Sequence, residues 1–223
     1  MRRRLISAFL VAAALVVAGA ALAAGRDPQK KFTAKDLAWA HAIRVHRADL
    51  PGTGWQPHRS SDAEDPSTPK ECRDPDLSDL VETGEAKNPD WSRGGSLVGS
   101  GAAVFADERQ AREAWRRVVR VPISHCLAVM LEGVSNPNTK VSVVSSGKLR
   151  LGALAPRQTA SRVRFVMRVA SSRISGRADI VVLSRGRANA TVMVVSFSAP
   201  FRPLSLATER RLLATVAHRL RER

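Results

Sequence analysis

Residues 179–197 read DIVVLSRGRANATVMVVSF, and this stretch decides the fold. It holds two runs, 180–183 and 191–197, that are β-branched or apolar at most positions, which is typical of central strands buried on both faces. The residues between them, Ser184-Arg185-Gly186-Arg187, are polar and include a glycine, which favours a tight turn. The sequence therefore predicts an antiparallel hairpin in the middle of a sheet.

Further strands and helices are predicted on both sides of this hairpin. Runs of strand character cover 96–106, 140–146 and 162–169, whereas 56–95 are broken by prolines and are expected to hold little regular structure. Helices are expected over 34–47 after a Thr33–Asp36 capping box, after Asp107, and after Ser205. This order predicts an α+β fold, an antiparallel sheet with helices packed on its faces in a single domain.

The N-terminal segment has the three parts of a secretory signal. Arg2, Arg3 and Arg4 precede an apolar run that ends in Ala21-Leu22-Ala23, so we expect a signal peptide over 1–24, a polar tether over 25–32 and one domain over 33–223. The alternative is an uncleaved anchor that faces outward, since 20 apolar residues can span a bilayer. In both cases the protein is expected to be secreted or associated with the cell envelope. If the signal is cleaved, no membrane span is expected in what remains.

The chain is strongly basic, with a formal charge of +16. Arginine-rich codon usage and a cationic surface for an anionic polymer are both open explanations. Arg162, Arg164 and Arg168 share one face of a predicted strand, where they form either an anion-binding site or the solvated face of an edge strand that resists aggregation. Nucleic acid is a poor candidate partner because aromatic residues make up 4% of the chain and tyrosine is absent.

The two cysteines, Cys72 and Cys126, predict a disulfide, because exported chains usually pair an even number of cysteines. Two free thiols or a bridge between chains are the alternatives. The bridge would tie the proline-rich segment to the residues that follow the helix after Asp107.

No residue pattern indicates catalysis, a metal or a cofactor. Ser124-His125-Cys126 are neighbours in sequence, whereas the groups of a catalytic triad converge from separate segments. His41 and His46 are five residues apart, which is the wrong spacing for a metal pair on a helix. We therefore expect no enzymatic activity and no cofactor.

Several segments together resemble a known group. They are ADLPGTGW (48–55), ECRDPDLSDLVETGEAKNPDW (71–91), SGAAVFADERQAREAWRRV (100–118) with HCL (125–127), and DIVVLSRGRANATVMV (179–194). They resemble secreted actinobacterial proteins of unassigned function and are distantly similar to the extracellular sensor domain of PknH-type serine/threonine kinases.

The resemblance implies an antiparallel sheet flanked by helices, no enzymatic activity and a ligand-sensing role. That sensor domain has two disulfides, whereas this chain can form one and has no kinase domain, and no binding residue carries over. The resulting expectation is a non-enzymatic exported module that binds a cell-envelope ligand or protein. The alternatives are an anionic-polymer binder and an enzyme of unrecognised type.

Overall fold

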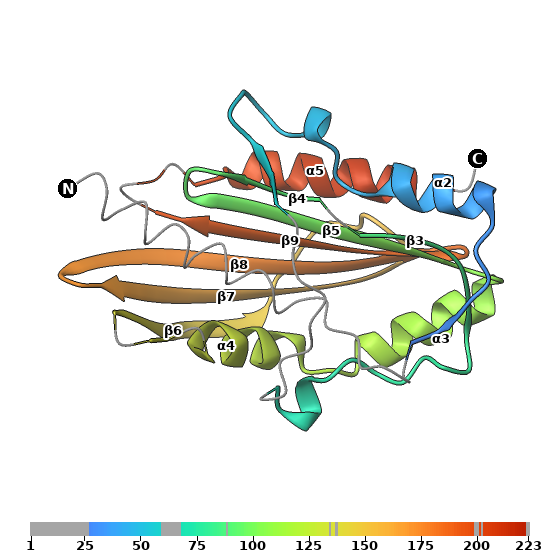
Figure 1. The fold of residues 1–223 in the computed structure, drawn as a ribbon, viewed down its shortest axis with the longest axis horizontal. Helices are drawn as coiled ribbons and strands as arrows, with labels where there is room; N and C mark the ends of the chain where they lie inside the picture. The colour runs from blue at the N-terminus through green and yellow to red at the C-terminus, as the bar shows by residue number, and fades with distance from the viewer. Residues whose placement is uncertain are drawn as a thin grey trace.

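The computed structural model describes residues 27–58, 68–87, 89–133, 135–136, 138–198, 201 and 203–221. Within these residues the strands form one nine-stranded sheet with the main order β1-β3-β5-β9-β8-β7-β6, and β4 pairs with both β5 and β2. The pairing is antiparallel except between β1 and β3. With its helices, the molecule has the α+β fold that the sequence predicts (Figure 1).

The bounds of the elements are as follows. The strands are β1 (Gln29–Lys30), β2 (Gln56–His58), β3 (Val81–Ala86), β4 (Asp90–Arg93), β5 (Ser96–Phe105), β6 (Thr139–Lys148), β7 (Arg157–Val169), β8 (Ser172–Arg185) and β9 (Ala188–Phe197). The helices are α2 (Ala34–Ile43), α3 (Glu108–Val118), α4 (Ile123–Gly133) and α5 (Leu206–Arg219), with 3-10 turns η2 (Arg47–Asp49) and η3 (Lys70–Cys72).

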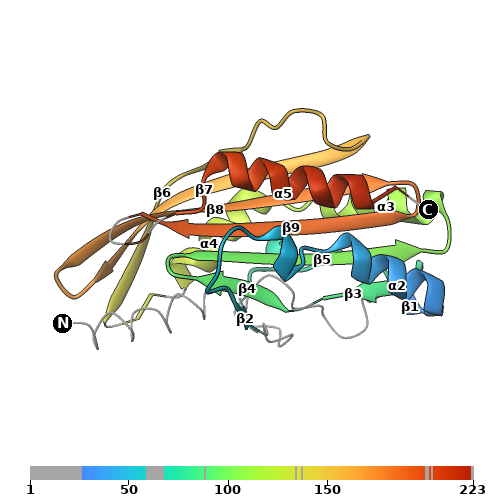
Figure 2. The ribbon, with the colours of Figure 1, turned by 90° about the horizontal axis from the view of Figure 1, so that it is seen from above.

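The helices cover the two faces of the sheet in pairs. Helices α2 and α5 lie on one face and α3 and α4 on the other, so the molecule has three layers (Figure 2). The α5 side chains expected to be apolar, Leu212, Leu213, Val216, Ala217 and Leu220, are all buried in the core on their face. Under α4, the buried cluster includes Phe165 and Phe197, whose rings meet edge to face.

Local sequence signals explain where several elements begin. The side chain of Thr33 accepts a hydrogen bond from the Asp36 amide at the start of α2, Asp107 accepts one from the Gln110 amide at the start of α3, and Ser205 opens α5 in the same way. Strands β8 and β9 are joined through Gly186, whose φ of 53° is a left-handed conformation that glycine adopts without strain.

Four expectations are corrected by the structure, and one helix was not expected. The segment 56–95 contains β2, β3 and β4, and residues 29–30 of the expected tether pair with β3. Helix α4, which follows Pro122 closely, was not predicted, and α2 ends at Ile43 rather than near Arg47. Strand β7 is paired on both sides, with β6 and β8, so it is not an edge strand.

The predicted signal segment, residues 1–24, lies outside the described residues. None of the helices in the described part of the chain is long and apolar enough to cross a membrane.

Candidate ligand-binding site

A pocket of about 260 Å³ lies between the sheet and α3, and we call it the α3 pocket. Its floor is made by facing pairs on β5 and β9, namely Gly99 with Met193, Gly101 with Thr191, and Ala103 with Asn189. Ile180 and Val182 of β8 extend the floor next to β9. Because the inward positions 101 and 103 of β5 are glycine and alanine, the floor leaves space that larger side chains would fill, whereas at Gly99 the Asp90 carboxylate takes that space.

Helix α3 forms the wall opposite this floor. Ala114, Trp115 and Val118 line the pocket from one side of the helix. The Asn189 side-chain amide of β9 donates to the Ala111 carbonyl at 2.9 Å, which fixes the helix over the strand. Trp115, which the sequence predicts to be part of the core stripe of this helix, is half-buried and faces the pocket.

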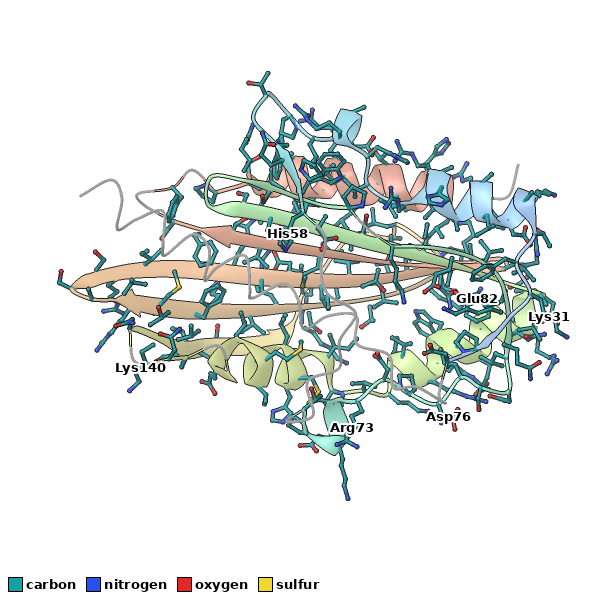
Figure 3. The ribbon with its side chains drawn as sticks, in the orientation of Figure 1. Lys31, His58, Arg73, Asp76, Glu82 and Lys140 are labelled. Atoms are coloured by element: carbon teal, nitrogen blue, oxygen red, sulfur yellow. A yellow bond between two sulfur atoms is a disulfide. The ribbon has the colours of Figure 1, made fainter. Side chains whose placement is uncertain are left out.

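A second wall comes from residues 72–80, which we call the strap, and from the end of β3. Asp74 and Leu77 of the strap line the pocket, as do Glu85 and Lys87. Figure 3 marks Arg73 and Asp76 in the strap, which runs from beneath α4 toward α3 in that view. The strap thus closes a side of the pocket that neither the sheet nor α3 covers.

The strap is fastened at both ends. At its start the structure joins Cys72 to Cys126 of α4, with Cα atoms 5.2 Å apart, as the sequence predicts. Near its other end the Arg117 guanidinium bonds both carboxylate oxygens of Asp79 and donates to the Asp76 carbonyl. A covalent bond and a bidentate ion pair therefore hold the wall against α4 and α3.

Two side chains in the pocket wall each hold a buried polar atom that has no hydrogen-bond partner within the part of the chain that the structure describes. These atoms are the Trp115 indole nitrogen Nε1, a donor, and the Asn189 oxygen Oδ1, an acceptor. Asn189 is bonded to Ala111, and Trp115 lies one helical turn further along α3, so both atoms belong to the same part of the pocket. An unmade hydrogen bond at a buried atom costs roughly 1–3 kcal/mol.

The other tryptophans show that Trp115 is an exception. Trp39 donates to the Arg219 carbonyl at 3.1 Å, Trp55 to the Pro51 carbonyl at 3.0 Å, and Trp91 to the Val45 carbonyl at 3.3 Å. Each of these three indoles serves the packing of its own segment. Of the four tryptophans, Trp115 is the one whose indole N–H has no acceptor among the described residues.

Charged groups at the β3 side of the pocket are paired with one another. Glu85 contacts Lys87 at 2.6 Å and Lys30 at 3.0 Å. Burial alone would raise the pKa of Glu85, but the two lysines outweigh it and hold that pKa below its usual range. In contrast, burial together with repulsion from Glu85 raises the pKa of the neighbouring Glu82 to about 8.

Of the three arginines predicted as a possible anion site, one has an acidic partner inside the protein. Arg162 forms a bidentate pair with the buried Asp179, at 2.6 and 2.7 Å, on the α5 face of the sheet. Arg177 extends this pair, bonding Asp179 at 3.2 Å and Glu209 of α5 at 2.8 Å. Arg162 therefore has an internal structural role, while Arg164 and Arg168 are exposed.

The other residues singled out in the sequence do not meet in a site. Cys126 is held in the disulfide, and the His125 side chain is more than half exposed, with Glu71 at 3.9 Å. Among the described residues, no three histidine, cysteine or acidic side chains gather closely enough to hold a metal.

Sequence reasoning missed the α3 pocket itself. Its signal was the run of small residues over 99–103, which does not reveal that a helix lies across one face of the strand.

Among known proteins, the chain is similar to a solved extracellular domain. No family model and no curated protein matches this sequence. Among solved structures, the chain is similar to one described as the extracellular domain of PknH from Mycobacterium tuberculosis, with 10% identity and a TM-score of 0.43. The match covers 88% of this chain and 98% of that one. This neighbour is of the kind that the sequence resemblance names, while secretion and an actinobacterial origin remain predictions.

Proposed function

We propose that the protein is a non-enzymatic exported binding module that holds a small, mainly apolar ligand of the cell envelope in the α3 pocket. The observation that carries the proposal is that two residues of a mainly apolar pocket wall hold unpartnered polar atoms. They are the donor Trp115 Nε1 and the acceptor Asn189 Oδ1. Ligand pockets combine apolar lining with a few convergent polar atoms in this way.

The chemistry of the lining supports binding rather than catalysis. Among the described lining residues there is neither histidine nor cysteine, and Glu85 and Lys87 neutralise each other, which leaves Asp74 and Asp90 as the other charged groups. The Ser100 hydroxyl already accepts a hydrogen bond from the Val45 amide at 2.9 Å on the α2 side. These groups are suited to orienting a ligand, and none is arranged as a nucleophile beside a base.

The size of the pocket limits the ligand. A volume of about 260 Å³ lies at the small end of ligand sites. The expected ligand has an apolar body and a group that both accepts and donates a hydrogen bond, such as an amide, a hydroxyl or a carboxylic acid.

The test is native mass spectrometry of the exported protein, purified from its own source without denaturation. We expect a bound small molecule on the wild-type protein and its loss from Gly101→Val, because a Cβ at 101 meets no atom closer than 3.7 Å and valine methyl groups would fill the pocket. Gly147→Val is the matched control, since Gly147 lies in β6 with open space around its Cβ position. Equal occupancy of Gly101→Val and Gly147→Val would refute the proposal.

A further inference from the structure

A second feature, far from the α3 pocket, concerns the distribution of charge. Residues 133–178, which include β6, β7 and most of the first half of β8, contain no aspartate or glutamate. Codon usage can explain why arginine outnumbers lysine, but it does not explain a lack of acids over this length. The same segment holds nine cations: Lys140, Lys148, Arg150, Arg157, Arg162, Arg164, Arg168, Arg173 and Arg177.

The sheet register sets three of these cations directly side by side. Lys140 of β6 is opposite Arg168 of β7, and Arg168 is opposite Arg173 of β8. We call these three residues the basic row. All three are exposed, and no ion pair within the described part of the chain involves any of them.

The basic row lies on an uncovered part of the sheet. The opposite face of the same strands is covered by α4, which packs on Phe165, Met167 and Ile174. On the α5 side, the tip of the β7–β8 hairpin extends well beyond the end of α5 in both views (Figures 1 and 2). The row is therefore open to a partner from that side.

Protection of sheet edges does not account for the whole row. Lys140 lies on the edge strand β6, and Arg173 lies where β8 extends beyond its pairing with β9, so both can discourage edge-to-edge association. Arg168 is flanked by strands on both sides and protects no edge. Placing it between two like charges costs stability, which suggests a role outside folding.

We propose that the basic row is a docking surface for an extended phosphate-bearing polymer. Lysine and arginine side chains neutralise phosphate groups, and the exposed Ser142 and Ser175, which flank the row at the next position on the same face, add hydroxyl donors. The aromatic residue of these three strands, Phe165, points to the α4 face, so the row has no stacking platform for bases. The exposed apolar side chain of these strands, Val144, lies beyond Ser142 on β6 and outside the row.

The proposal is tested by fluorescence anisotropy with labelled inorganic polyphosphate, over a series of salt concentrations, using the exported protein. The triple variant Lys140→Gln, Arg168→Gln, Arg173→Gln should bind about tenfold more weakly. The slope of log K against log salt concentration should fall in magnitude by about 2, because fewer phosphate contacts mean that fewer counterions are released on binding. Because all three side chains are exposed, the variant should keep its fold, which circular dichroism checks.

The matched control is Lys31→Gln, Arg109→Gln, Arg120→Gln, which removes the same charge from exposed positions elsewhere. Lys31 lies at the other end of the molecule from Lys140 (Figure 3). A generic charge effect would weaken both variants alike, and that result would overturn the proposal. So would wild-type binding to vesicles of phosphatidylglycerol but not to polyphosphate, because it would assign the row to a membrane surface.

Discussion

The two faces of β5 show how one strand can serve both a closed core and an open site. Toward α2 and α5 it presents Val98, Ala102 and Val104, which are buried in the core cluster of that face. Toward α3 it presents Gly99, Gly101 and Ala103, and there the pocket lies. The pocket lies where glycine and alanine at 101 and 103 leave side-chain volume unfilled, while the packed side chains of β5 keep the sheet stable.

The devices that hold the helices differ in the same way. On the closed face, apolar packing of α5 is joined by the buried pairs of Arg177 with Asp179 and Glu209. On the open face, the strap depends on a disulfide and on Arg117. Apolar packing and buried ion pairs therefore stabilise the α5 face, whereas a disulfide and an exposed ion pair hold the strap on the α3 face.

Removing the disulfide should have the largest effect and should reach the open face first. Cys72→Ser with Cys126→Ser opens a loop with a sequence separation of 54, which should lower the free energy of unfolding by about 4 kcal/mol. Hydrogen exchange should show that residues 72–80 and α4 lose protection while α5 keeps it. Uniform loss of protection across both faces would contradict the division between them.

The closed face is tested by Leu213→Ala. Leu213 is a fully buried residue of α5, and its truncation should lower the free energy of unfolding in urea by about 3 kcal/mol. The comparison is Val118→Ala on α3, which borders existing space and should cost about 1 kcal/mol or less because less packing is lost. Equal costs would mean that the α3 side is packed as tightly as the α5 side.

Two buried carboxyl groups sharpen the contrast through pH. Burial and the neighbouring Asp179 raise the pKa of Glu209 to about 7 although Arg177 bonds it. Burial raises the pKa of Glu82, which accepts no side-chain hydrogen bond among the described residues, to about 8. The folded protein then holds a proton at Glu82 that the unfolded chain has released, so stability falls as pH rises from about 4.5 to about 8. Glu82→Gln should remove the part of this loss that Glu82 contributes and leave the part from Glu209, so it should unfold at higher urea than the wild type at pH 9, by about 2 kcal/mol. A parallel pH dependence of both proteins would contradict the assignment.

The smallest expected effect is that of Trp115→Phe on stability. Phenylalanine removes the unpartnered indole donor and keeps most of the aromatic surface, so the free energy of unfolding should change by less than about 1 kcal/mol. Trp91→Phe is the comparison on the other face, because its indole donates to Val45 and its loss leaves that carbonyl without this bond. Trp91→Phe should therefore be the more destabilising of the two.

Much of the sheet was predictable because its strands carry their own signals. Strands β7, β8 and β9 have long β-branched or alternating runs, and α3 and α5 have N-caps followed by apolar stripes. Strand β3 was missed because its sequence, VETGEA, is polar and its pairing with β5 is set by tertiary contacts. Helix α4 was missed because it follows α3 after only a short turn around Pro122.

The site was harder to predict than the fold for a physical reason. Ala111, Trp115 and Val118 have helical spacing that fits a core stripe, and the sequence does not show that the strands beneath them are lined by small residues. For the arginines the difficulty was the opposite, because the sequence shows three cations on one face of a strand. It does not show that Arg162 has a buried acidic partner, Asp179, 17 positions away. Pockets and ion pairs depend on which segments meet, which single-chain periodicity does not encode.

The central claim, that the α3 pocket binds a ligand through Trp115, is tested most directly by nuclear magnetic resonance of the indole N–H groups. The four tryptophans give four signals, and Trp115→Phe assigns the relevant one. On titration with the neutral probe N-phenylnaphthylamine, the account predicts that the Trp115 signal moves while those of Trp39, Trp55 and Trp91, which are already bonded to carbonyl groups, stay in place. A Trp115 signal that does not move, or that moves no more than the other three, would contradict it.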